Sequence, residues 1–297
     1  MSDRAGAGAG PPPSPAQGAA RARPPVAMTI AGSDSGGGAG IVADLKTFAA
    51  HGVWGTTAVV AVTAQNTLGV SAFETLPAAL VRAQVLDVAR DIGVDAAKTG
   101  MLATAELVGV VAAAVADAGI GRLVVDPVFV SKHGDTLLAD DAVGALREEL
   151  LPRATVVTPN LPEASALTGV KIADREGMEQ AARVLAATGA RVVMVKGGHL
   201  GGDTSPDLVL DGAGGEVRWL EGPRLPGRHT HGTGCVLSAA IGAELARGMD
   251  PADACVAGKR FVERAIAAGV ELGTGVGPVD PDWERPLSPG RQGWSPA

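Results

Sequence analysis

The sequence predicts a three-layer α/β/α domain with a mostly parallel central sheet. Short runs rich in Val and Ile alternate along the chain with helical patterns, and these runs lack a period-two alternation of apolar and polar residues. Such runs are typical of strands buried on both faces. A strand–helix–strand order pairs strands in parallel through right-handed crossovers. Of the 297 residues, 46% are hydrophobic and 19% are charged, which suits one large domain with a sizeable core.

The elements follow in order from the first apolar run, VAMTIAG, which ends in Gly and is expected to be a strand. The other expected strands are equally apolar runs that lead into Gly or polar residues: 56–65, 94–100, 122–128, 154–160 and 191–199. The expected helices lie between and after them: 39–52, 77–93, 104–119, 140–152, 176–189, 234–247 and 251–271. Segments 207–212 and 215–221 are expected to pair as an antiparallel hairpin at a sheet edge.

The two ends of the chain differ in composition from the rest. Residues 1–25 are mostly Gly, Ala, Pro and Arg, with almost nothing to bury, and predict a disordered leader. The domain is expected to span residues 26–279, and the Pro-rich stretch 280–297 is expected to be a loose tail.

Charge and cysteine content exclude several classes of function. The net charge is −7 and no long basic run occurs, so neither nucleic acid nor an anionic membrane surface is an expected partner. No apolar run approaches the ~20 residues of a membrane span, and no signal-peptide core is present near the start. The two cysteines, Cys235 and Cys255, make neither a disulfide framework nor a metal cluster, which indicates the reducing cytoplasm.

Polar loop motifs follow most of the expected strands. Sheets of this kind bind ligands at the carboxyl ends of their strands. The motifs at those ends are GSDSGGGAG (32–40), TAQN (63–66), KTGM (98–101), DPVFVSKHGD (126–135), TPNLPE (158–163) and VKGGH (195–199). One binding cleft along this edge is therefore expected.

The motif HTHGTGC (229–235) opens an apolar helix and is the sharpest single signal. The backbone N–H groups of Gly232, Thr233 and Gly234 would converge on one point, where the helix dipole adds positive charge. This arrangement predicts a hole for an anion such as a transferring phosphoryl group. The same field is expected to lower the pKa of Cys235, which could then act as a base toward a substrate hydroxyl. The alternative is a small buried cysteine at a helix start.

Two carboxylates and two lysines fall in the other loops. Glu163, with Asn160, follows one strand, and Asp126 ends another. Carboxylate oxygens are ligands for Mg²⁺, although Asn160 and Glu163 could equally cap a helix. Lys132 and Lys196 could hold phosphate, the alternative being a solvated surface lysine.

Other residues suit a flat heterocycle. Gln65 offers donors and an acceptor to a ring edge, or else caps a strand end. Met101 could form a soft apolar wall, or be ordinary core. The small residues from Gly32 to Gly40 let the backbone approach a ligand closely, or form only a flexible turn.

Taken together and in this order, the segments from AGSDSGGGAGIVADLKTFAAHG through KTGML, DPVFVSKHGD, TPNLPEA, VKGGH and THGTGCVLSAAI resemble the hydroxymethylpyrimidine/phosphomethylpyrimidine kinases of thiamine biosynthesis. The resemblance covers about Val26 to Val279 and implies a ribokinase-like fold. It implies two ATP- and Mg²⁺-dependent phosphorylations, first of 4-amino-5-hydroxymethyl-2-methylpyrimidine and then of its monophosphate. It also implies a homodimer.

The resemblance also assigns roles to residues. Around the pyrimidine ring it places Gln65, Gly32, Ala39, Asp44, Met101 and Val128. It places Gly232, Thr233 and Gly234 in the anion hole, Cys235 as the base, Glu163 at the Mg²⁺ element and Lys196 on the nucleotide side, with Asp126 a further metal candidate. Sugar kinases of this fold carry Asp where Cys235 stands, so the cysteine points to the vitamin kinases. One departure is Val42, where many relatives have Gln.

Two rival functions remain open on sequence alone. A pyridoxine/pyridoxal kinase of vitamin B6 salvage shares the cysteine motif and a similar ring pocket. A non-catalytic pyrimidine-binding protein with the same fold would lack the anion hole or the Mg²⁺ element, and both segments are present here.

Overall fold

The computed structural model describes residues 23–129, 134, 137–139, 141–198, 200–225 and 227–285. The leader is described only from Arg23, whose guanidinium pairs with Asp95 at 2.9 Å. Residues 1–22 and 286–297 lie outside the described part, so the disordered leader and the loose tail stay predictions.

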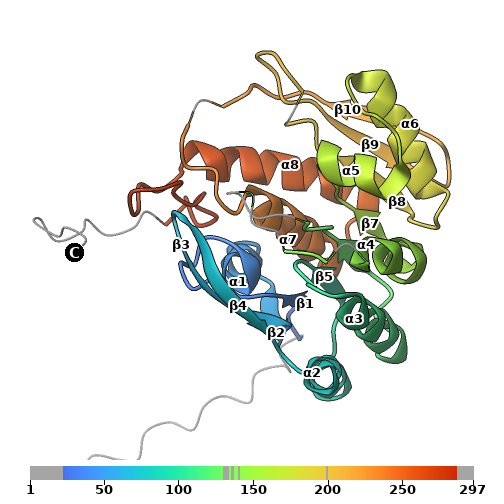
Figure 1. The fold of residues 1–297 in the computed structure, drawn as a ribbon, viewed down its shortest axis with the longest axis vertical. Helices are drawn as coiled ribbons and strands as arrows, with labels where there is room; N and C mark the ends of the chain where they lie inside the picture. Colours follow the sequence, from blue (N-terminus) through green and yellow to red (C-terminus); the bar gives the residue numbers. More distant parts are fainter. Residues whose placement is uncertain are drawn as a thin grey trace, which may run out of the picture.

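A mostly parallel sheet forms the middle layer, as predicted (Figure 1). Within the described residues its eight strands lie in the order β10-β9-β8-β7-β6-β5-β1-β2. Their bounds are β1 Val26–Ala31, β2 Trp54–Val59, β5 Ala96–Thr99, β6 Leu123–Val125, β7 Val156–Val157, β8 Val192–Val195, β9 Asp207–Asp211 and β10 Val217–Leu220. Pairing is parallel from β2 to β8 and antiparallel at β8–β9 and β9–β10, so the expected edge hairpin is confirmed.

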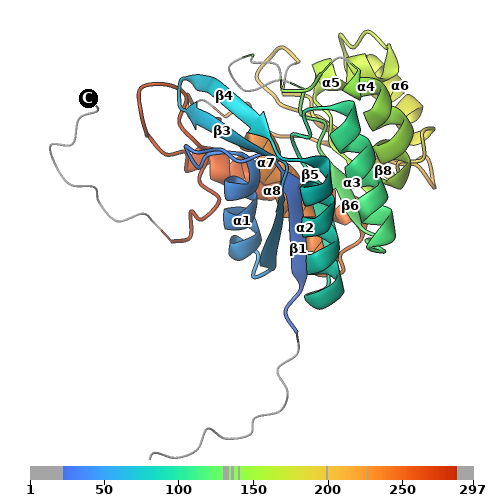
Figure 2. The same ribbon diagram turned by 60° about the horizontal axis from the view of Figure 1, so that its bottom comes forward.

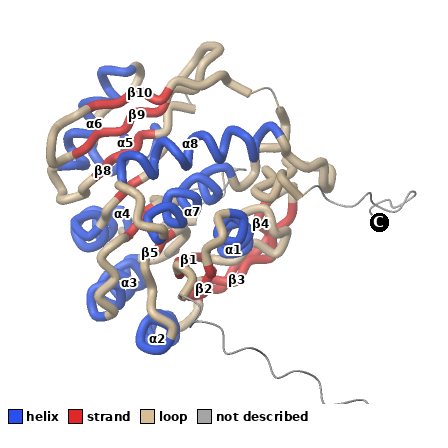
Figure 3. The backbone as a smooth tube through the Cα atoms, turned by 180° about the vertical axis from the view of Figure 1, so that it is seen from behind, coloured by secondary structure: helices blue, strands red, loops and turns tan. Residues whose placement is uncertain are grey.

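Helices cover both faces of the sheet. On one face lie α1 (Gly40–Ala50), α7 (Thr233–Ala246) and α8 (Pro251–Ala267), seen in front of the strands in Figure 3. The other face carries α2 (Ala78–Asp91), α3 (Ala105–Asp117), α4 (Ala142–Ala145, continued by π and 3₁₀ turns to Arg153), α5 (Leu161–Thr168) and α6 (Arg175–Ala186). Successive strand residues point to opposite cores: Ala27 packs toward α7, and Met28 packs with the α2–α3 side. Strands buried on both faces explain why no polar alternation marks them in the sequence.

The expected single strand 56–65 is wrong. The strand β2 ends at Val59, and β3 (Ala61–Asn66) turns back on β4 (Gly69–Thr75) as a separate two-stranded sheet. The N–H of Val60 still donates to the Ala31 carbonyl, so the chain leaves the main sheet only at the next residue. In Figure 2 this hairpin projects beyond the end of the sheet where β1 ends. It therefore overhangs the edge at which ligands were expected.

Helix α5 (Leu161–Thr168) was not among the expected helices, although helix capping by Asn160 and Glu163 was one of the two alternatives left open. Asn160 and Glu163 form a capping box at its start: the Asn160 side chain accepts from the Glu163 N–H at 2.9 Å, and Glu163 Oε2 accepts from the Asn160 N–H at 2.8 Å. Pro162 lies in the first turn of this helix, where proline is well tolerated. No helix among the described residues is both long and apolar enough to cross a bilayer.

Candidate active site

A cavity of about 520 Å³ opens at the carboxyl ends of β1, β5, β6 and β8, beneath the β3–β4 hairpin. Most of the residues singled out in the sequence line it: Gly32, Ala39, Gln65, Met101, Asp126, Val128, Glu163, Lys196, Gly232, Thr233, Gly234 and Cys235. Segments about 200 residues apart in the chain, such as those of Gly32 and Cys235, thus meet in one cleft. Lys132 lies outside the described residues.

One end of the cavity has an apolar wall. Met101 is buried, and a Cβ atom built on Gly32 would lie 3.2 Å from its sulfur. Glycine at position 32 therefore leaves room for the thioether beside the first loop. Val128 and Ala39 add small apolar surface, and Gln65 adds a carboxamide. A flat ring with polar edges fits such a lining.

Asp44 is placed differently from the expectation, because it does not line the cavity. Its carboxylate is fully buried, accepts from Thr29 Oγ1 at 2.6 Å and pairs with Lys98 Nζ at 3.0 Å. Burial alone would lower the pKa of Lys98, but the Asp44 carboxylate outweighs this effect and raises it. Lys98 itself reaches the cavity wall. Asp44 therefore acts on the cavity through its neighbours and not by touching a ligand, mainly through Lys98.

The start of α7 has the geometry expected of an anion hole. Gly232 is the N-cap residue with φ 81°, and no side chain caps the helix. A Cβ atom on Gly232 would overlap the Gly38 carbonyl oxygen, so only glycine fits between the two loops. The Thr233 N–H makes a long contact with the Thr230 carbonyl at 3.4 Å, and no side chain takes up the N–H groups of this first turn, which can therefore still be offered to a ligand.

The expected low pKa of Cys235 is wrong. Burial raises the pKa of the Cys235 thiol to about 11, and the nearby Asp44 and Asp126 carboxylates raise it further. The Lys98 ammonium and a hydrogen bond from the Gly40 N–H oppose these effects without overcoming them. The helix terminus was recognised correctly, but the sequence could not show how much water the site excludes.

A charged cluster lies next to the anion hole. Asp126 accepts hydrogen bonds from Lys196 Nζ at 3.0 Å, Thr158 Oγ1 at 3.1 Å and Ser238 Oγ at 3.1 Å. Lys196 Nζ also lies 3.9 Å from Glu163 Oε2. A Cβ atom on Gly234 would be 3.6 Å from the same ammonium. Positive and negative groups therefore meet where a transferring phosphate would reach the helix.

Burial raises the pKa of Glu163 to about 7, and the neighbouring Asp126 carboxylate adds to this effect while Lys196 opposes it. Burial alone would raise the pKa of Asp126, but Lys196 and Lys98 outweigh it and lower the pKa. Glu163 both caps α5 and lines the cavity, so the two readings left open by the sequence are compatible.

The sequence reasoning missed several residues of this cavity. Lys98 was passed over although a lysine inside the apolar run VDAAKTG has to find a buried partner. Asp34 and His231, which pair at 2.9 Å, stand in two recognised motifs, but neither side chain was given a role. Lys259 also lines the cavity and pairs with Asp207 at 2.9 Å. The sequence of its helix does not show that this lysine side chain faces the cavity and not the solvent.

A three-layer fold with a ring-sized apolar subsite, a helix-start anion hole and a charged cluster in one cleft defines a small-molecule kinase. Comparison with known proteins agrees: the phosphomethylpyrimidine kinase family matches residues 34–280. The chain belongs to this family.

Three relatives illustrate the similarity. The hydroxymethylpyrimidine/phosphomethylpyrimidine kinase of Streptomyces coelicolor is 53% identical over 88% of this chain and 95% of its own length. A Bacillus subtilis pyridoxal kinase solved with ADP matches with a TM-score of 0.80 and 39% identity, over 86% of this chain and 97% of the other. The phosphomethylpyrimidine kinase of Clostridium difficile matches with a TM-score of 0.72 and 37% identity, over 81% and 99% of the two chains.

Proposed function

We propose that this protein phosphorylates 4-amino-5-hydroxymethyl-2-methylpyrimidine and then its monophosphate, using Mg-ATP, in thiamine biosynthesis. The observation that carries the proposal is the placement of a ring subsite and an anion hole in the same cavity. Membership of the phosphomethylpyrimidine kinase family supports the choice of substrate.

The ring is bound at the apolar end of the cavity in this proposal. Met101 and Val128 contact its faces, Gln65 hydrogen-bonds its edge, and Gly32 and Ala39 allow the backbone to approach it. The hydroxymethyl group then points toward the start of α7. The monophosphate places a charged group at the same position, where N–H donors and Lys196 can stabilise it.

Phosphoryl transfer takes place at the N-terminus of α7. The N–H groups of Gly232, Thr233 and Gly234 stabilise the transferring phosphoryl group. The substrate oxygen forms a bond to the γ-phosphorus, the bond to the β-phosphate oxygen breaks, and ADP leaves. Cys235 accepts the hydroxyl proton as its thiolate, which Lys98 and the Gly40 N–H favour. Because the thiol pKa is about 11, turnover should rise with pH above neutrality.

Two carboxylates suit a magnesium ion. Asp126 and Glu163 both line the cavity, at 3.0 Å and 3.9 Å from Lys196 Nζ, so each would hold the cation directly or through a bound water. Hard oxygen donors beside a phosphate site are the environment that Mg²⁺ prefers, usually with several retained waters. The ion would neutralise charge that develops between the β- and γ-phosphates. Lys196 would hold a phosphate as a point charge.

A pyridoxal kinase is the second candidate, because solved structures similar to this chain include pyridoxal kinases. Pyridoxal also presents a flat ring and a hydroxymethyl group. The anion hole and the charged cluster would act in the same way on either substrate, so the two functions differ only at the ring subsite.

An ADP-release assay tests the proposal. Hydroxymethylpyrimidine, its monophosphate, pyridoxal and ribose are compared side by side with Mg-ATP, and EDTA addition tests the metal. Turnover of the first two, with pyridoxal far slower, is the expected result. Pyridoxal as the best substrate would establish the second candidate. Specific ring binding without ATP consumption would instead indicate a non-catalytic binding protein.

We also propose a homodimer that works in the cytoplasm. The β2 edge and the β3–β4 hairpin expose large apolar side chains, including Trp54, Val62 and Phe73. Such a patch is well suited to burial against a second copy. Light scattering after gel filtration tests the dimer, and Val62→Glu should weaken it. The free thiols of Cys235 and Cys255 support a reducing compartment.

A further inference from the structure

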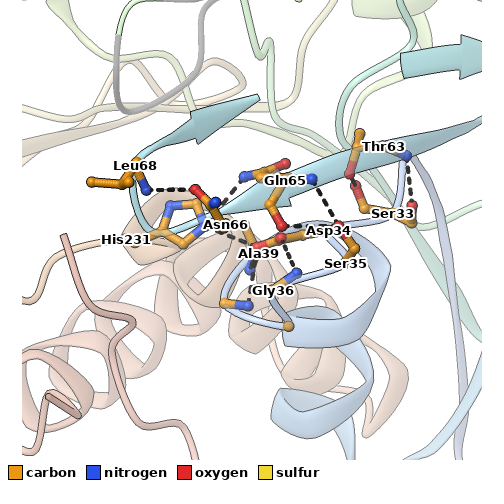
Figure 4. A network of polar contacts seen from close by, with 12 residues as sticks. Ser33, Asp34, Ser35, Gly36, Ala39, Thr63, Gln65, Asn66, Leu68 and His231 are labelled. Atoms are coloured by element: carbon orange, nitrogen blue, oxygen red, sulfur yellow. Dashed lines mark hydrogen bonds and ion pairs between the residues drawn. The ribbon is translucent and has the colours of Figure 1, made fainter. Parts of the chain in front are cut away.

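A buried acid–imidazole pair joins the first loop of the cavity to the loop before α7 (Figure 4). Asp34 Oδ2 lies 2.9 Å from His231 Nε2. The same carboxylate accepts from the N–H groups of Gly36 at 2.8 Å, Gly38 at 3.0 Å and Ala39 at 2.8 Å. Burial alone would raise the pKa of Asp34, but His231 and these donors outweigh it and lower the pKa. Asp34 is therefore a carboxylate, which only accepts hydrogen bonds.

The charge on Asp34 determines the proton on His231. A carboxylate at 2.9 Å requires a donor, so His231 Nε2 carries a hydrogen directed at Asp34. This holds for the neutral ring and for the charged ring, whatever Nδ1 contacts. Both residues are almost fully buried, with exposed fractions of 2% and 6%, so water is a poor substitute for either partner.

The carboxamide of Gln65 meets the same ring nitrogen. The structure places Gln65 Nε2 at 3.4 Å from His231 Nε2. An NH₂ group cannot donate to a nitrogen that already carries a hydrogen. The oxygen and nitrogen ends of a carboxamide are almost equal in size, so hydrogen-bond chemistry decides which end faces which partner. Hydrogen-bond chemistry therefore favours the reverse of the placed atoms, with Oε1 facing His231 and the NH₂ group turned away from the histidine.

The rest of Gln65 is held in place by neighbouring groups. Ser35 Oγ donates to the Gln65 carbonyl at 2.9 Å and accepts from the Gln65 N–H at 2.8 Å. Gly38 lets the imidazole approach, because a Cβ atom there would lie 2.6 Å from His231 Cδ2. With the backbone fixed and one end of the carboxamide facing His231, the other end has one direction left. Figure 4 draws the nitrogen of the carboxamide toward His231 and the oxygen away from it, and the hydrogen-bond argument exchanges these two atoms without moving the side chain.

We infer that the Asp34–His231 pair is a positioning device that orients the Gln65 carboxamide, so that its NH₂ group donates to an acceptor nitrogen of the bound ring. The inference rests on the proposed function only in requiring a nitrogen heterocycle as substrate. Asp34 and His231 do not touch the ring in this scheme. By orienting the Gln65 carboxamide, they determine which edge of the ring the cavity binds. Because His231 lies in the loop that leads into the anion hole, they also link the ring subsite to that loop.

The decisive variant is Gln65→Glu, which replaces the NH₂ group by an oxygen of the same size. Binding of hydroxymethylpyrimidine without nucleotide is measured by titration calorimetry. In the inferred orientation an acceptor now faces the ring nitrogen, and we expect binding to weaken roughly 10-fold or more. If the wild-type carboxamide presented its oxygen to the ring, Gln65→Glu would keep that contact. Unchanged or tighter binding would therefore overturn the inference.

A second comparison tests the pair itself. A ring analogue with C–H in place of the acceptor nitrogen should bind the wild type roughly 3- to 10-fold more weakly than the parent ring. The preference should vanish in His231→Phe and persist in His231→Gln, because a primary amide can still donate to Asp34. The matched control is His51→Gln, a buried histidine outside the cavity, which should change stability without changing the preference. A preference that survives in His231→Phe would refute the role of the pair.

Failure of the proposed function is seen separately. Turnover of hydroxymethylpyrimidine and of pyridoxal by the wild type is measured on the same preparation, and both rings carry an acceptor nitrogen. If pyridoxal is the better substrate, the proposed function is wrong. The inference is then tested separately, by comparing the binding of pyridoxal to the wild type and to Gln65→Glu.

Discussion

The reactivity of Cys235 provides a quantitative test of the site's electrostatics. An ordinary thiol has a pKa near 9.0, whereas burial raises that of Cys235 to about 11. The thiolate fraction at pH 8 is then about 100-fold smaller than that of an ordinary thiol. A more basic thiolate is also more nucleophilic, with a Brønsted coefficient of about 0.4–0.5, which restores about 6- to 10-fold. Alkylation of Cys235 should therefore be about 10-fold slower than that of a free model thiol.

The assay is iodoacetamide labelling followed by peptide mass spectrometry, which separates Cys235 from the fully buried Cys255. The labelling rate of Cys235 should rise about tenfold per pH unit from 7 to 10 and level off only near 11. Mg-ATP should protect this peptide, because the thiol lines the cavity. A plateau at pH 8 or below would refute the reasoning, and would show that the N-terminus of α7 and the Gly40 N–H activate the thiol despite its burial.

Three further predictions concern catalysis and stability. Cys235→Ala should lower turnover by roughly 10²–10⁴-fold and leave ring binding by calorimetry mostly intact, and unchanged turnover would remove the cysteine from the proposed mechanism. Gly232→Ala should lower the Tm strongly, because a Cβ atom there would overlap Gly38. The matched control is Gly248→Ala, whose glycine has φ 95° but no close neighbour, and it should lose only about 1–2 kcal/mol of unfolding free energy. Equal losses of stability in the two variants would contradict the loop contact. Glu163 has a folded pKa near 7, above its unfolded value of 4.5, so the stability it contributes is full below pH 4.5 and lost as the pH rises through 7. Urea unfolding should show wild type losing up to about 3 kcal/mol more than Glu163→Gln between pH 5 and 8, and parallel pH profiles would contradict the raised pKa.

The central sheet could be predicted because burial on both faces leaves a strong mark in the sequence. Apolar runs such as 122–128 contain a strand, even though β6 itself has only the three residues Leu123–Val125. The β3–β4 hairpin could not be separated from β2 in the same way. Its strand β3 continues the apolar run of β2 with a single residue, Val60, between them, so composition gives no boundary. The change of partner depends on the loop at Ser33, which hydrogen-bonds Ala61 and Thr63, 28 and 30 residues further along the chain.

Site residues could be predicted where a reactive or polar side chain stands in a loop that follows a strand. They could not be predicted where their role depends on how deeply the side chain is buried. Gln65, Met101 and the α7 motif could be identified because polar or glycine-rich loops follow strands. The pKa of Cys235 depends on desolvation, which is a property of the assembled cavity and not of the motif. Asp44 was assigned to the ring, but its partner Lys98 lies 54 residues away and takes up both carboxylate oxygens.

The glycines of the first loop illustrate how a correct motif can have a different physical cause. In the sequence, GGGAG suggested close approach of backbone to a ligand. In the structure, Gly38 admits the His231 ring, and the Gly38 carbonyl leaves no room for a side chain at position 232. The glycines are thus required for two protein loops to meet, about 190 residues apart in the chain. Because the same contact holds Asp34 against His231 and sets the first turn of α7, the ring subsite and the anion hole form together. A substitution at Gly38 should therefore impair ring recognition and phosphoryl transfer jointly, whereas a substitution of Met101 should affect the ring alone.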